Sequence, residues 1–259
     1  MKSVAEIKKE LAMCTVWEPW MDELKTDSRR SIQTLLTGWR RKLARHDALI
    51  HNHELKINFD SSYKMAPADL IAGIDEAGRG PLAGPVVTAA VILPADCSRL
   101  VGLDDSKKLS LAKRNHYAEI IKEIAVSYAV HIQPPEEIDR LNIYQATKMS
   151  MTAAAVQLDP QPAVILADAM KLDVSQQCES IIKGDTKSLA IAAASILAKT
   201  GRDALMDSYA EEYPQYGFNK HAGYGTKEHV AALNEHGPCP IHRKTFEPVK
   251  SILLNKTKD

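Results

Sequence analysis

The sequence predicts an α/β domain with a mixed β-sheet flanked by helices, preceded by a helical N-terminal extension. From residue 70 onward, short apolar runs that suit buried strands alternate with longer segments of helical periodicity, which is the pattern of an α/β domain. The first two of these runs follow each other without a helix between them, which predicts a hairpin and therefore a mixed sheet. The first 69 residues contain all three tryptophans and have helical character throughout.

Residues 1–69 are expected to form an accessory helical extension, with substrate binding as its candidate role. In residues 31–45, apolar side chains including Trp39 recur near helical spacing, with basic residues between them. Such a basic face either contacts a nucleic-acid duplex or lies in solvent over a small core anchored by tryptophan, and the sequence favours neither. The segment 60–70 contains Pro67 and predicts a linker, so we place the second domain at residues 70–259.

The elements of residues 70–259 follow one another as an α/β domain requires. Apolar or β-branched runs predict strands at 70–78, 85–94, 126–133, 163–169 and 179–185. Segments of helical periodicity predict helices at 109–125, 142–158 and 188–213.

Composition sets broad limits on the class of protein. Lys plus Arg and Asp plus Glu are equal at 33 each, and a zero net charge neither supports nor excludes a nucleic-acid partner, because a local basic patch can contact phosphates. The four cysteines lack the close spacing of a disulfide framework. No signal peptide or membrane-spanning run is apparent, so we expect a cytoplasmic protein without a membrane partner.

The acids at the predicted strand ends carry the functional prediction. Asp75, followed by Glu76, ends one strand, and Asp168 and Asp185 end two others. Strand ends converge on the functional crevice of an α/β sheet, and carboxylates that meet there repel one another unless cations lie between them. Mg²⁺ prefers such oxygen ligands, and two ions about 4 Å apart can activate water and stabilise the leaving oxygen in phosphodiester cleavage. The pattern therefore predicts a metal-dependent nuclease.

Other interpretations of the acids stay open at this point. Asp favours turns on physical grounds, so any single one of these acids is better explained as a solvated turn residue, and only the three together favour a metal site. Spacing alone does not exclude four further acids as members of the site: Asp104, Asp105, Asp173 and Asp203.

Two further motifs suggest other chemistry, and we set both aside. The segment 78–84, GRGPLAG, resembles a dinucleotide-binding loop, but its third glycine comes one position too late and Pro81 interrupts the start of a helix. His236, Cys239 and His242 suggest zinc, but no second Cys–His pair lies nearby in the sequence.

Four segments resemble type 2 ribonuclease H, in its bacterial ribonuclease HII branch. They are GIDEAGRGPLAGPVVTAAVIL, DDSKKLS, GDTKSLAIAAASILAKTGRD and YPQYGFNKHAGYGTKEHVAALNEHGPCPIHRKTF, which stand in family order between about residues 71 and 249. The resemblance implies a ribonuclease H-like mixed sheet and makes residues 70–259 the catalytic domain. It also implies that Asp75, Glu76, Asp168 and Asp185 hold Mn²⁺ or Mg²⁺. Residues 1–69 resemble the extension that some bacterial forms carry.

The same resemblance implies a substrate and its contacts. The expected reaction is hydrolysis of the RNA strand of RNA–DNA hybrids, and incision 5′ to ribonucleotides embedded in duplex DNA, leaving 3′-hydroxyl and 5′-phosphate ends. Gly78, Arg79 and Gly80 match the segment that contacts the ribose 2′-hydroxyl, the group that distinguishes RNA from DNA. Tyr224 matches a tyrosine that stacks on the following deoxyribose. Lys107, Lys108 and Ser195 are expected on the phosphate side. No obligate protein partner is implied.

Two positions depart from the common family pattern. Asp168 is followed by Ala169 where many members have glycine, and Ala222 stands where many have lysine.

Three rival functions remain. Ribonuclease HIII cuts hybrids but handles isolated ribonucleotides poorly, and its DEVGTGD-like segment differs from this chain at Arg79 and Pro81. A non-catalytic hybrid-binding protein need not keep all four acids. A resolvase-like or transposase-like nuclease of the same fold would not require a 2′-hydroxyl.

Overall fold

The computed structural model describes residues 2–256 and divides into two compact units, Met1–Glu54 and Leu55–Asp259. The division falls inside one helix, α3 (Arg30–Ser61), so the end of that helix belongs to the second unit. None of the helices described is long and apolar enough to cross a membrane.

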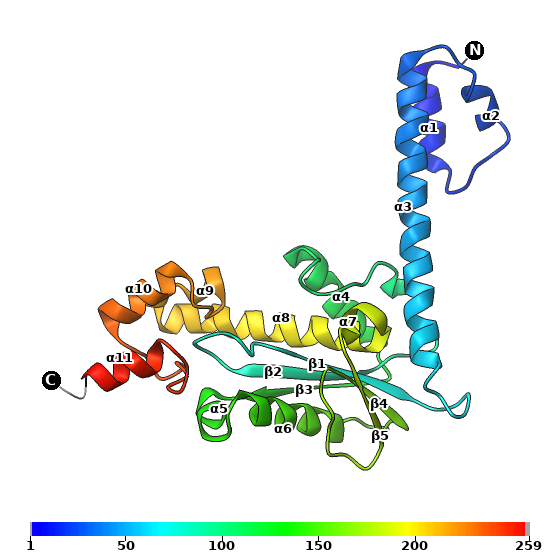
Figure 1. The fold of residues 1–259 in the computed structure, drawn as a ribbon. Coiled ribbons are helices and arrows are strands. Elements are labelled where there is room, and N and C mark those ends of the chain that lie inside the picture. The colour runs from blue at the N-terminus through cyan, green and yellow to red at the C-terminus, as the bar shows by residue number, and fades with distance from the viewer. Residues whose placement is uncertain (1, 257–259) are drawn as a thin grey trace. The chain divides into compact units, whose positions relative to one another are not determined.

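The N-terminal unit is helical, as the sequence predicts. It consists of α1 (Val4–Met13), α2 (Met21–Leu24) and the first part of α3 (Figure 1). Ser3 begins α1 with a capping box, because its hydroxyl accepts from the Glu6 N–H while the Glu6 carboxylate accepts from the Ser3 N–H. The small core is contributed by all three helices: Ile7, Leu11, Met21, Leu24, Ile32, Leu36 and Trp39.

The second unit is built on a five-stranded mixed sheet in the order β3-β2-β1-β4-β5. The strands are β1 (Ile71–Ala77), β2 (Val86–Ile92), β3 (Ser127–Gln133), β4 (Val164–Asp168) and β5 (Gln177–Ile181). β1, β2 and β3 pair antiparallel, whereas β4 pairs parallel with both β1 and β5. The predicted hairpin and mixed sheet are therefore confirmed.

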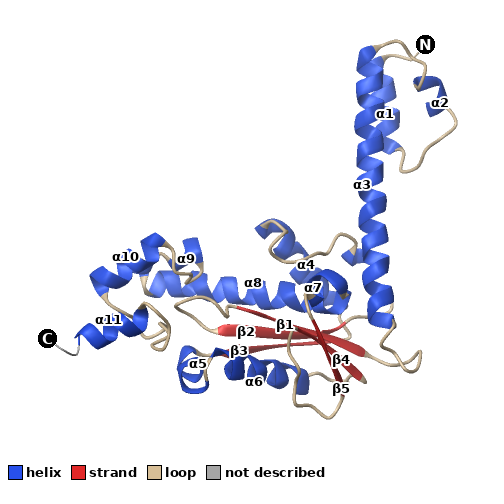
Figure 2. Ribbon diagram, viewed as in Figure 1, coloured by secondary structure: helices blue, strands red, loops and turns tan. Residues whose placement is uncertain are grey.

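Helices cover both faces of this sheet (Figure 2). The helices before the last strand are α4 (Leu111–Ile124), α5 (Pro135–Leu141) and α6 (Ile143–Val156). Those after it are α7 (Gly184–Lys187), α8 (Leu189–Glu212), α9 (Phe218–His221), α10 (Lys227–His236) and α11 (Val249–Lys256). α8 lies on one face of the sheet and α6 on the other.

The central strand β1 and α8 approach each other closely because both carry small residues. A Cβ at Gly73 would lie 2.0 Å from the carbonyl carbon of Ala190, so only glycine fits there. Further along α8, the buried alanines 192–194 belong to a core cluster that also contains Ala89 and Val91 of β2. The close approach fixes α8, and with it every side chain that this helix presents at the end of β1.

One element prediction is wrong. The run 179–185 was expected to be a strand ending in Asp185, but β5 ends at Ile181 and Asp185 lies in α7. The chain leaves the strand because Lys183 adopts a left-handed conformation with φ 56°, which a continuing strand does not allow. Asp185 therefore approaches the site from a short helix.

Candidate active site

A cavity of about 420 Å³ lies at the carboxyl ends of β1 and β4. Its lining includes every residue that the sequence assigned to the site except Lys108. The complete lining is Asp75, Glu76, Ala77, Gly78, Arg79, Gly80, Ser106, Lys107, Asp168, Asp185, Ser195, Lys199, Arg202 and Tyr224. The fold thus gathers residues that are up to 149 positions apart in the sequence, from Asp75 to Tyr224.

The sheet register brings Asp75 and Asp168 together. Ile74 of β1 pairs with Ala167 of the parallel strand β4, so the residues that follow them stand side by side. The Asp75 side chain is buried, and its Oδ1 accepts a 2.7 Å hydrogen bond from the Glu76 N–H. Burial raises the pKa of Asp75 well above its ordinary value, and repulsion from Glu76 and Asp168 raises it further.

Glu76 is only partly neutralised. Its Oε1 lies 3.3 Å from Nη1 of Arg79, whereas its buried Oε2 accepts no hydrogen bond from any residue the structure describes. Burial is also the main cause that raises the pKa of Glu76, against the opposing effect of Arg79. A buried carboxylate oxygen without a donor calls for a cation or a bound water.

Asp185 is placed by its neighbours in the turn. The Gly184 N–H donates a 2.7 Å hydrogen bond to Oδ1 of Asp168, which joins the start of α7 to the end of β4. A Cβ at Gly184 would lie 2.5 Å from Cδ1 of Ile191 and 3.3 Å from that same Asp168 oxygen, so a side chain here would displace Ile191 and press on Asp168. Burial, followed by repulsion from Asp105 and Asp168, raises the pKa of Asp185.

These acids fit a hydrated divalent ion. Within residues 2–256, no three His, Cys, Asp or Glu side chains are arranged to hold a metal ion by themselves. Mg²⁺ ordinarily keeps several waters and is bound through one or two carboxylates together with substrate phosphates, so a ready-made protein cage is not required. The mutual repulsion of the acids and the unpartnered Glu76 oxygen favour bound positive charge.

Two buried arginines shape the loop that follows β1. Arg202 donates from Nε to the Pro85 carbonyl at 3.0 Å and from Nη2 to the Ala83 carbonyl at 3.1 Å. Arg243 donates from Nη1 to the Arg79 carbonyl at 2.8 Å and from Nη2 to the Gly78 carbonyl. Both side chains remain cations near neutral pH, although burial lowers the pKa of Arg202 to about 10 and that of Arg243 to about 9.

Gly78 is glycine for a reason that the sequence does not show. Its φ is +96°, and a Cβ there would lie 2.0 Å from Nε of Arg202. At Gly80 the nearest atom to an added Cβ is Cε1 of Tyr224 at 3.6 Å, an ordinary contact distance. Gly78 is therefore required by the fold itself, whereas nothing in the fold excludes a side chain at Gly80.

The remaining expected contacts divide into two groups. Tyr224 is about half exposed and lines the cavity, as do Lys107 and Ser195. The Ser195 hydroxyl lies 3.1 Å from that of Ser106. Lys108 lies outside the cavity lining, and its Nζ pairs with Oδ2 of Asp104 at 3.1 Å. Lys108 is more than half exposed, and its ammonium has further N–H donors beyond the one that pairs with Asp104.

The competing acids do not line the cavity. Asp104 pairs with Lys56 and Lys108, and Asp173 pairs with Lys148. Asp203 pairs with Lys199 and Arg114. Asp105 accepts a hydrogen bond from the Lys107 N–H and acts on Asp185 only by repulsion.

Sequence reasoning missed Lys199 and Arg202 as members of the cavity. Both follow Ser195 on α8 at spacings of four and seven, so the three side chains lie on one face of that helix. That spacing in the sequence could have predicted that Lys199 and Arg202 lie on the same side of the helix as Ser195. Arg243 gave no comparable signal, because it bonds to backbone carbonyls rather than to side chains.

The histidines near the C-terminus form a buried hydrogen-bonded cluster. Nε2 of His229 lies 3.0 Å from Nε2 of His242, whose Nδ1 lies 3.1 Å from Sγ of Cys239. Burial lowers the pKa of His242 to about 4, so the cluster is neutral near pH 7. The His229 and His242 side chains are therefore held by protein groups in the interior, which is a structural setting.

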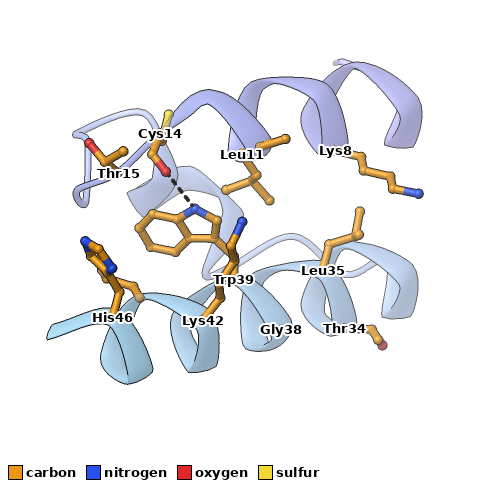
Figure 3. A pocket seen from close by; sticks show the side chains of 12 residues that line it. Lys8, Leu11, Cys14, Thr15, Thr34, Leu35, Gly38, Trp39, Lys42 and His46 are labelled. Atoms are coloured by element: carbon orange, nitrogen blue, oxygen red, sulfur yellow. Dashed lines mark hydrogen bonds between the residues drawn. The ribbon is translucent and has the colours of Figure 1, made fainter. Parts of the chain in front are cut away.

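A second cavity lies wholly within the N-terminal unit. It measures about 520 Å³ and runs between α1 and α3, with Trp39 donating a 3.3 Å hydrogen bond from Nε1 to the Cys14 carbonyl (Figure 3). Lys8, Lys42 and His46 line it, without any carboxylate. Arg40, which lies in the basic segment 31–45, stacks on the ring of Trp17 at 4.6 Å. The role of this unit in substrate binding stays a prediction.

Comparison with known proteins covers both units. A family model described as Ribonuclease HII matches residues 72–249, and one described as Ribonuclease HII N-terminal domain matches residues 3–64. Ribonuclease HII of Bacillus licheniformis is 50% identical over 250 residues, which cover 96% of this chain and 98% of that protein. Ribonuclease HII of Bacillus subtilis is 48% identical over 238 residues, covering 91% and 92% of the two chains.

Solved structures support the fold. The crystal structure of ribonuclease H2 from Pyrococcus horikoshii matches with a TM-score of 0.64 and 26% identity, over 73% of this chain and 100% of that one. The predicted ribonuclease H-like fold and the resemblance found in the sequence are both confirmed.

Proposed function

Because the chain belongs to the ribonuclease HII family of endonucleases, which degrade the RNA strand of RNA–DNA hybrids, we propose that it also incises duplex DNA on the 5′ side of an embedded ribonucleotide. The enzymes of this family depend on divalent metal, and we propose Mn²⁺ or Mg²⁺ for this chain. The products would carry 3′-hydroxyl and 5′-phosphate ends.

The observation that carries the proposal is the loop 78–80 in the wall of the acidic cavity. Arg243 occupies the Gly78 and Arg79 carbonyls, whereas the N–H groups of Arg79 and Gly80 donate to no described residue. These donors are available to a ribose 2′-hydroxyl beside the acids. A contact with one 2′-hydroxyl suits recognition of a single ribonucleotide, because it does not require a run of RNA.

The other residues of the cavity have separate roles in this proposal. Asp75, Glu76, Asp168 and Asp185 would hold two metal ions, which would activate a water for in-line attack and stabilise the leaving 3′ oxygen. Lys107 and Lys199 lie in the same lining and are suited to the scissile phosphate. Tyr224, about half exposed beside Gly80, is suited to stack on the sugar that follows the ribonucleotide.

Three labelled duplexes of one sequence test the substrate. They carry a continuous RNA strand, a single ribonucleotide, or DNA alone. We expect cleavage of the first two and none of the third, with the single incision on the 5′ side of the ribonucleotide. Cleavage of the long hybrid alone would indicate ribonuclease HIII-like specificity, and cleavage of the DNA duplex would contradict the requirement for a 2′-hydroxyl.

Substitution of one acid tests the catalytic assignment. We expect Asp75→Asn to abolish cleavage while leaving hybrid binding largely intact, because the change removes a metal ligand without changing the loop 78–80. Asp173→Asn is the matched control, since Asp173 pairs with Lys148 outside the cavity. Cleavage by Asp75→Asn at the wild-type rate would refute the assignment, whereas loss of activity in both variants would point to a general effect of the substitution.

A further inference from the structure

We propose that Lys56 is a positioning residue for Asp185 and thereby sets the affinity of the site for a divalent ion. Lys56 lies near the end of α3, in the part of that helix that belongs to the second unit. The inference rests on the proposed role of Asp185 as a metal ligand and adds a residue that lies outside the cavity lining.

The Lys56 ammonium joins two segments that carry cavity residues. Its Nζ donates to the backbone carbonyl of Asp185 at 3.3 Å and to that of Leu103 at 3.2 Å. It also donates to Oδ1 of Asp104 at 3.3 Å. Asp185 stands in α7, and Leu103 and Asp104 begin the loop that continues to Ser106 and Lys107. One side chain thus holds the backbone of an acid and the start of a substrate-side loop at a fixed separation.

The Lys56 ammonium is nearly completely buried, so its position is determined by the acceptors around it. The side chain is only 2% exposed, and a buried ammonium is unfavourable unless its donors are satisfied. All three of its donors have acceptors here, two of them backbone carbonyls that cannot move without moving the chain. The ammonium is therefore a rigid three-point connection.

The Asp185 carbonyl needs such a donor. α7 spans only Gly184–Lys187, and the last carbonyls of any helix lack partners within the helix. The Gly184 carbonyl is satisfied by the Ser188 N–H, and the Asp185 carbonyl by Lys56. Without the ammonium, the turn that carries the Asp185 side chain would lose its connection to α3.

A second contact from the same helix end fixes the neighbouring segment. Oδ2 of Asp60, one turn after Lys56, accepts a 2.9 Å hydrogen bond from the Ala190 N–H. Ala190 lies in the first turn of α8, where helix N–H groups lack partners within the helix and need an acceptor from elsewhere. Lys56 and Asp60 therefore hold the α7–α8 junction on both sides of Ser188, which leaves Asp185 little freedom to turn away from Asp168.

Groups that support metal ligands without touching the ion typically alter metal affinity about 10–100-fold when removed. The test uses the full-length chain and measures Mn²⁺ binding by calorimetry without substrate, beside turnover as a function of Mn²⁺ concentration. Lys56→Met keeps the length and apolar stem but removes the donors. Lys148→Met is the matched control, because it removes a lysine paired with Asp173 away from the cavity and changes the net charge equally.

We expect Lys56→Met to weaken Mn²⁺ binding roughly tenfold and Lys148→Met to leave it unchanged. Saturating Mn²⁺ should restore most of the turnover of Lys56→Met, a rescue that a general loss of folded protein would not give. Mn²⁺ affinity within twofold of wild type in a folded Lys56→Met protein would overturn the proposal.

Two further variants distinguish a failure of the positioning role of Lys56 from a failure of the metal role of Asp185. Lys56→Gln keeps shorter donors and should bind Mn²⁺ with intermediate affinity. If neither Lys56 variant folds, as judged by circular dichroism, the residue acts on the whole unit and the proposal is refuted. Asp185→Asn tests the underlying assumption: unchanged Mn²⁺ binding there would refute the metal role of Asp185 itself. Weakened binding in Asp185→Asn with normal binding in Lys56→Met would refute only the positioning role.

Discussion

Replacing Gly78 by alanine should destabilise the catalytic unit, whereas the same change at Gly80 should not. At Gly78 the positive φ of +96° alone costs about 1–2 kcal/mol for a residue with a Cβ. The new Cβ would also lie 2.0 Å from Nε of Arg202, so that side chain must move. This movement would break the hydrogen bond from Arg202 to the Pro85 carbonyl. A hydrogen bond from a charged donor contributes about 1.5–3 kcal/mol to the free energy of unfolding.

Together these effects predict a loss of about 3 kcal/mol in the free energy of unfolding for Gly78→Ala. For a unit of this size, that loss corresponds to a decrease of roughly 6–12 °C in Tm. Gly80→Ala has no such clash, since the nearest atom is 3.6 Å away. It should keep the wild-type stability but cleave poorly, because its Cβ would hold the loop away from the ribose.

Far-ultraviolet circular dichroism in urea is the suitable assay, with cleavage of the single-ribonucleotide duplex measured in parallel. Tryptophan fluorescence provides an internal control, since all three tryptophans lie in the N-terminal unit and should not respond to either change. Stability of Gly78→Ala within about 0.5 kcal/mol of wild type would refute the reasoning, because surface substitutions commonly have effects of that size. Equal destabilisation by Gly80→Ala would refute the distinction between the two glycines.

Three other predictions concern pH, substrate choice and the metal. Burial raises the pKa of Asp60 from 3.8 to about 6, so the folded state binds the proton more tightly and stability is lost as pH rises through this window. Urea unfolding should therefore show Asp60→Asn gaining stability relative to wild type by roughly 1–2 kcal/mol more at about pH 7.5 than at about pH 5, and a pH-independent difference would contradict this. Tyr224→Ala should cut the single-ribonucleotide duplex roughly tenfold more slowly while cutting the long hybrid nearly normally, as judged by kcat/KM on each; equal losses would argue against stacking at the junction. Ca²⁺ should bind in calorimetry without supporting turnover, because its looser geometry misplaces the attacking water, and robust cleavage in Ca²⁺ alone would exclude this explanation.

The architecture was largely predictable because its signals are local. The alternation of strand-like and helical segments gave the mixed sheet, and the acids at strand ends gave Asp75 and Asp168 as neighbours, which the register of β1 and β4 explains. Asp185 was assigned to the right cavity but to the wrong element. The apolar run before it resembles a strand, and the left-handed Lys183 that ends the run has no sequence signature of its own.

The supporting residues were not predictable, for a shared physical reason. Lys56, Arg202 and Arg243 all bond mainly to backbone carbonyls of distant segments. Every residue has a carbonyl, so no pairing of residue types marks such contacts in a sequence. The Lys56 contact with Asp185 also spans 129 positions, and Lys56 lies in the N-terminal extension predicted at residues 1–69, outside the predicted catalytic domain.

The continuity of α3 through the boundary between the units has a consequence for how the enzyme can be divided. Residues 55–61, which carry Lys56 and Asp60, make about two helical turns. A helix of that length is unstable alone in water, because its first turn is costly to nucleate. The preceding turns of α3 supply that nucleus, so residues 55–61 depend on the part of the same helix that comes before them. Deleting the N-terminal unit would remove both the helical turns that precede Lys56 and any substrate contact that the unit makes. Exposed substitutions such as Arg41→Ala keep α3 intact and therefore test the substrate contact alone.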